Sequence, residues 1–226
     1  MDNLSAKNKL IFFRFLNDEL AFSELQNFLF ETKELEKELR KEIYTDFLLF
    51  QHNHKTTIDH LDHLLFQRDH KNAIEHLKEY VSKITPESEF ETWKLTELLK
   101  KFINEPKKIK EYLDIFYDLY CGTFDEFRGG FSLGYIFLEH LGLNYFWWID
   151  EHYLRYAYGW NWKSEYRKTL DNLEYYHQQL RPIAEKILKA IQLGDIKIIS
   201  KGKYEITEEL KRELESDKIF KLKHPE

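Results

Sequence analysis

Apolar residues recur every three or four positions along most of the chain, and this spacing predicts amphipathic helices. In residues 4–16 the repeat is formed by Leu10, Phe13 and Leu16. Residues 32–50 show the same pattern, and Thr32 is expected to cap the predicted helix. Two more apolar stripes predict a short helix capped by Ser23 and one or two helices over residues 58–81.

Two prolines mark the starts of further helices. Thr85 and Pro86 form a typical start, because threonine caps a helix well and proline suits its first position. Pro106 is expected to open another helix in the same way. A group of four glycines then follows: Gly122, Gly129, Gly130 and Gly134. This group predicts a boundary between residues 1–121 and residues 122–226, as two halves of one compact unit.

Three further helices are predicted after the glycines, over residues 133–142, 143–158 and 164–193. Pro182 lies inside the last of these and is expected either to kink it or to split it. The 226 residues include only 8 glycines and 4 prolines. This scarcity disfavours a β-sandwich or barrel, in which turns recur about every 8–12 residues. It favours long helices joined by short loops.

The C-terminal part of the sequence has a different pattern. Gly194 is placed to end the preceding helix. The stretch DIKIISKGKYEIT that follows has the alternation of a β-hairpin, with Gly202 in its turn. Thr207 is then expected to cap a last helix that has acidic residues in its first turn. The sequence therefore predicts a mostly α fold, a multi-helix bundle with a small C-terminal β-hairpin and a capping helix.

The composition indicates a folded protein of a reducing compartment. Hydrophobic residues make up 42% of the chain and charged residues 33%, which suits a packed core. Cys121 is the single cysteine, so no internal disulfide and no cysteine-based zinc site is predicted. The apolar run 10–13 is too short for a secretory signal, and no run approaches the ~20 residues of a membrane span. We therefore expect a cytoplasmic protein with no membrane contact.

The net charge of −6 narrows the class of partner. It disfavours a protein whose main ligand is the phosphate backbone of a nucleic acid. An acidic surface instead speeds association with a basic protein. The predicted hairpin could be the wing of a winged-helix module, but it contains only three lysines and an acidic helix follows it. We expect it to cover the end of the helical core.

Six of the ten histidines lie in one region and raise the question of a metal site: His52, His54, His60, His63, His70 and His76. A metal site needs three or four ligands that converge on one point. The sequence lacks both HExxH and the pair of ExxH motifs found on facing helices of metal proteins. We expect these histidines to be solvated or capping residues, and we predict neither a metal nor another cofactor.

Other catalytic signatures are weak in the sequence. Residues 130–134, GFSLG, have the spacing GxSxG but no predicted strand before them, and Cys121 has no predictable histidine neighbour, so nucleophilic catalysis is not predicted. Residues 129–134, GGFSLG, lack the preceding strand, the GxGxxG spacing and the lysine of a phosphate-binding loop. Adjacent carboxylates such as Asp150 and Glu151 are expected by chance among 40 acidic residues. We therefore do not expect an enzyme.

The most unusual stretch is residues 145–162, YFWWIDEHYLRYAYGWNW, which holds four of the five tryptophans. Tryptophan and tyrosine are frequent anchors of protein interfaces, although aromatic residues at helical spacing also form cores. Both interpretations stay open for the stretch as a whole. Its end, beside Gly159, is predicted to be a loop at the surface. The candidate partner-binding residues are Asp150, Glu151, Tyr158, Trp160 and Trp162.

Residues 11–53 resemble the opening segment of helical immunity proteins from bacterial polymorphic-toxin and contact-dependent competition systems. The matching residues are Phe15-Leu16-Asn17, Phe28-Leu29-Phe30 and Glu34-Leu35-Glu36. Phe28 stands where the pattern usually has tryptophan, and Asp18 where it usually has glycine. The resemblance implies a protein that binds a cognate toxin and blocks its active site or its delivery, without chemistry of its own.

The leading hypothesis is therefore an immunity-type protein that neutralises a cognate toxin domain, predicted to be basic. One alternative is a helical metal-dependent enzyme that uses the His52–His76 region. A second alternative is a regulatory or scaffold protein, linked to nucleic acid through the C-terminal hairpin. The sequence leaves the oligomeric state open.

Overall fold

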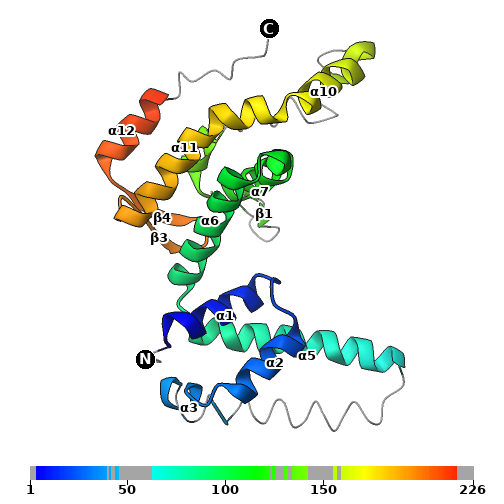
Figure 1. Ribbon diagram of the computed structural model, residues 1–226, viewed down its shortest axis with the longest axis vertical. Helices are drawn as coiled ribbons and strands as arrows, with labels where there is room; N and C mark the ends of the chain where they lie inside the picture. Colours follow the sequence, from blue (N-terminus) through cyan, green and yellow to red (C-terminus); the bar gives the residue numbers. More distant parts are fainter. Residues whose placement is uncertain are drawn as a thin grey trace. The chain divides into compact units, whose positions relative to one another are not determined.

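The computed structural model is mostly α-helical, as the sequence predicts (Figure 1). It describes residues 4–39, 41, 44–45, 63–122, 124–125, 130–131, 134–141, 155–156 and 159–217. The chain forms two compact units, Met1–Phe90 and Glu91–Glu226, called unit 1 and unit 2 below. The boundary that the glycines predict, after residue 121, lies within unit 2.

Unit 1 consists of helices around one apolar core. Its helices are α1 (Ala6–Leu16), α2 (Phe22–Glu31), α3 (Leu35–Glu38) and α5 (His63–Ile84), and it includes the first four residues of α6 (Glu87–Asn104). The core combines apolar residues of these helices that recur at helical spacing, among them Phe12, Phe15, Leu25, Leu29, Leu77 and Val81. Because α5 is continuous, the stripe that ends at Val81 belongs to a single helix from residue 63 onwards.

Local hydrogen bonds determine where the first two helices begin. Ser5 caps α1, because its Oγ accepts a hydrogen bond from the Asn8 backbone N–H at 3.4 Å. The start of α2 differs from the prediction, since Ser23 lies inside the helix. There the Ala21 N–H donates to the Glu24 carboxylate at 2.8 Å, which satisfies the backbone without a hydroxyl cap.

The predicted helix over residues 32–50 is interrupted. Thr32 follows α2 as its C-terminal cap, and its N–H donates to the Phe28 carbonyl at 3.0 Å. The next helix, α3, has only four residues and ends at Leu39, whose backbone is extended with ψ 152°. Thr32 is therefore the end of one helix and not the start of another. Residues 46–50 lie outside the described residues.

A carboxylate ties the end of α3 to the start of α1. Glu38 Oε2 accepts hydrogen bonds from the Ser5 N–H at 2.9 Å and from the Asn8 Nδ2 at 2.8 Å. Desolvation raises the pKa of Glu38, but the hydrogen bonds from Ser5 and Asn8 outweigh it, so the pKa lies below its usual value. Asn8 is buried, and this contact satisfies its amide.

Unit 2 contains the rest of α6 and a series of shorter elements. They are η1 (Pro106–Lys108), α7 (Ile109–Cys121), β1 (Phe124–Asp125), β2 (Gly130–Phe131), η2 (Ile136–His140), η3 (Gly159–Asn161), α10 (Trp162–Asp171), α11 (Leu173–Leu193), β3 (Ile196–Ser200), β4 (Lys203–Ile206) and α12 (Glu208–Asp217). The core of unit 2 is formed mainly by α6, α7, η2 and α11, and the β3–β4 hairpin packs on it.

Two predicted helices of unit 2 differ in the structure. Residues 136–140, within the first of them, form the 3₁₀ helix η2. The long helix over residues 164–193 is broken at Asn172, whose φ of −115° and ψ of 18° lie outside the α region. Pro182, the expected point of distortion, lies inside α11, and the helix continues through it. Of the helix predicted over residues 143–158, the structure describes only 155–156, which are helical.

The C-terminal hairpin and helix are confirmed. β3 and β4 pair antiparallel, with Ile196 opposite Ile206. Gly194 ends α11 in the left-handed conformation, with φ 83°, and Gly202 in the hairpin turn has φ 73°. The Lys211 N–H donates to the Thr207 carbonyl at 3.0 Å, at the start of α12. These elements were predictable because each depends on a residue within its own segment.

Candidate functional site

The structure describes part of the predicted aromatic surface. Trp160 lies on η3, and its relative exposure is 101%, so the ring is fully in solvent. The backbone of Trp162 begins α10. Asp150, Glu151 and Tyr158 lie outside the described residues. The exposure of Trp160 agrees with the predicted position at the surface, but the predicted loop is helical, since residues 159–161 form a 3₁₀ helix and Trp162 is the first residue of α10.

Gly159 sets the conformation of the turn that carries Trp160. Its φ is +53°, in the left-handed region that favours glycine. A Cβ at this position would meet no other atom within 4 Å, so the turn stands in open space. The backbone therefore presents the Trp160 ring without packing it against unit 2.

Tyr156 adds a second exposed ring that was not among the predicted site residues. It is 90% exposed, four residues before Trp160. In the sequence, Tyr156 is one of several aromatic residues of the stretch 145–162, for which both a core and a surface position stayed open. We define Tyr156 and Trp160 together as the aromatic surface.

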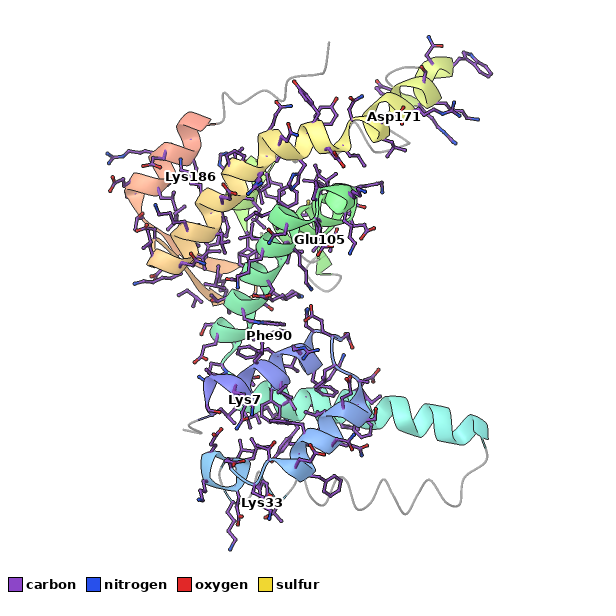
Figure 2. All side chains as sticks on the ribbon, in the orientation of Figure 1. Lys7, Lys33, Phe90, Glu105, Asp171 and Lys186 are labelled. Atoms are coloured by element: carbon purple, nitrogen blue, oxygen red, sulfur yellow. The ribbon has the colours of Figure 1, made fainter. Side chains whose placement is uncertain are left out.

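The charged side chains described beside the aromatic surface are mostly cationic. Arg155 precedes Tyr156, and Lys163 and Arg167 follow Trp160 one turn apart on α10. All three side chains are exposed. Figure 2 shows side chains of α10 that extend away from the ribbon, in the region labelled at Asp171. The acidic pair that we predicted for this surface lies outside the described residues, so its place in the surface stays a prediction.

Unit 1 has an exposed ring of its own. Phe30 on α2 is 61% exposed, while Leu25 and Leu29 on the same helix are buried. The apolar stripe of α2 was predicted from Leu25, Phe28 and Leu29, and Phe30 falls outside that stripe. An apolar residue that departs from the buried face was the signal that could have identified it.

The buried polar contacts of unit 2 join elements of its core. The Tyr135 hydroxyl donates to Glu91 Oε2 at 3.1 Å, and the Ser200 carbonyl lies 3.5 Å from the same hydroxyl. Both side chains of the first pair are buried, with 6% exposure for Glu91 and 1% for Tyr135. This contact joins α6, the residue before η2 and the end of β3. It therefore positions these elements relative to one another in the core of unit 2.

The histidine region is described only in part. His76 is exposed on α5, and the backbones of His63 and His70 lie on the same helix. The other three histidines of the region are outside the described residues. Within the described ranges, no group of three or more His, Cys, Asp or Glu side chains is arranged to hold a metal ion. The metal-dependent alternative thus gains no support from these residues.

The glycine-rich stretch has a structural use. Gly130 belongs to β2, and Gly134 passes so close to α7 that a Cβ there would lie 1.9 Å from the Leu119 carbonyl oxygen. The Tyr135 N–H donates to that same oxygen at 2.8 Å. Gly134 therefore permits a close backbone contact between this segment and α7.

Comparisons with known proteins identify no relative: no family model, no curated protein and no solved structure matches the chain. In the part of the chain that is described, no helix has the length and apolar character needed to cross a bilayer.

Proposed function

We propose that this protein is a binding protein of the immunity type, which engages a cognate toxin domain and performs no chemistry itself. The observation that carries the binding role is the full exposure of Trp160, four residues after Tyr156, which is 90% exposed. Exposed large aromatic residues are frequent anchors of protein interfaces. The proposal that the protein is of the immunity type rests, in addition, on the resemblance of residues 11–53 to the helical immunity proteins.

The energetics of the aromatic surface favour a partner protein. A buried aromatic side chain removes about 150–250 Å² from water, and its loss from the centre of an interface costs about 2 kcal/mol or more. Both rings stand next to exposed polar and charged side chains, as interface anchors do when a polar rim surrounds them. We infer that the partner covers Trp160 in the complex.

The test is binding of the full chain to the product of the gene next to its own, measured by calorimetry. Trp160→Ala should weaken binding about thirtyfold, which is the equivalent of 2 kcal/mol. Leu193→Ala is the matched control, because Leu193 is 68% exposed at the end of α11 and is not part of the aromatic surface. Absence of binding by the wild type, or equal affinity of the Trp160 variant, would contradict the proposal.

Metal analysis separates the proposal from the enzyme alternative. Purified full-length protein is expected to contain no stoichiometric transition metal. A ratio near one zinc, iron or manganese per chain would favour the His52–His76 region as a metal site, because several histidines there could act as ligands.

A further inference from the structure

We draw no further inference here: the strongest candidate, the exposed side of η3 and α10 that carries Trp160 with Lys163 and Arg167, belongs to the site already described, and nothing among the described residues shows what covers it.

Discussion

The imidazole Nε2 of His177 lies 2.6 Å from the backbone carbonyl oxygen of Phe102, 75 residues away in the sequence. A carbonyl only accepts, so Nε2 carries the proton and donates. The reason this carbonyl needs a donor is in the sequence: its helical partner would be the N–H of Pro106, which proline lacks. His177 on α11 therefore satisfies the end of α6, and its ring also packs on the Phe102 ring at 5.2 Å between centroids.

Replacement of His177 should destabilise unit 2. His177→Leu keeps an apolar side chain of similar size but leaves the buried Phe102 carbonyl without its donor. We expect a loss of about 1–3 kcal/mol in the free energy of unfolding, measured by urea titration. His177→Gln, which can donate from its amide, should lose less. Gln178→Ala is the control at the adjacent exposed position, and an equal loss there would refute the role of the hydrogen bond.

Gly134 should tolerate no side chain. In Gly134→Ala the new Cβ would lie 1.9 Å from the Leu119 carbonyl oxygen and 2.9 Å from the Gly122 nitrogen, and both of these are backbone atoms. The backbone must therefore move, and we expect a loss of at least about 3 kcal/mol in the free energy of unfolding.

The control for this prediction is Gly159→Ala. Gly159 has positive φ but open space around it, so only the left-handed conformation is penalised, by about 1–2 kcal/mol. Thermal unfolding of both variants checks the order. A Gly134 variant as stable as the Gly159 variant would mean that the contact with α7 is not required.

The contact of Glu38 with Ser5 and Asn8 should make unit 1 sensitive to acid. The folded-state pKa of Glu38 is below the ordinary glutamate value of 4.5, so the native state binds this proton less tightly than the unfolded state. The contribution is then present above pH 4.5 and is lost as the pH falls through the lower, folded pKa.

Glu38→Gln tests this contribution. The variant should be less stable than the wild type by about 1 kcal/mol at neutral pH, because hydrogen bonds to a charged acceptor exceed those to a neutral one. The difference should shrink as the pH falls below 4.5. Urea unfolding at several pH values measures it, with Glu36→Gln as the neighbouring exposed control. A difference that stays constant with pH would argue against the assigned pKa direction.

The sequence predicted the elements whose signals are local, and it missed those set by distant contacts. Gly194 and Gly202 identify the C-terminal hairpin because each supplies a backbone conformation that its own turn requires. The end of α3 was missed because Glu38 is held by residues 30 and 33 positions away. The contact between His177 and the Phe102 carbonyl could not be predicted from the sequence either. Pro106 indicates that this carbonyl lacks its helical donor, but nothing in the sequence identifies His177 as the replacement.

The candidate surfaces show the same division. Trp160 could be placed at the surface because Gly159 marks a turn. Phe30 was not predicted because it falls outside the apolar stripe, and an exposed ring is recognised only once the buried face of α2 is known. Periodicity therefore identifies what a helix buries more reliably than what it presents.

Alkaline unfolding should depend on Tyr112. Burial raises its pKa to about 12, and a hydrogen bond from its hydroxyl to the Glu105 carboxylate adds to the shift. The native state therefore retains this proton above pH 10, where the unfolded state releases it. The stabilising contribution is complete below pH 10 and is lost as the pH rises through about 12.

Tyr112→Phe removes both the proton and the hydrogen bond. The variant should unfold with a free energy about 1 kcal/mol below that of the wild type at pH 8. Above pH 10 the wild type should lose stability more steeply, so that the two curves approach each other towards pH 12. Tyr156→Phe, at an exposed position, should follow the wild type throughout. Parallel curves for the wild type and the Tyr112 variant would show that this hydroxyl is not what links the fold to alkaline pH.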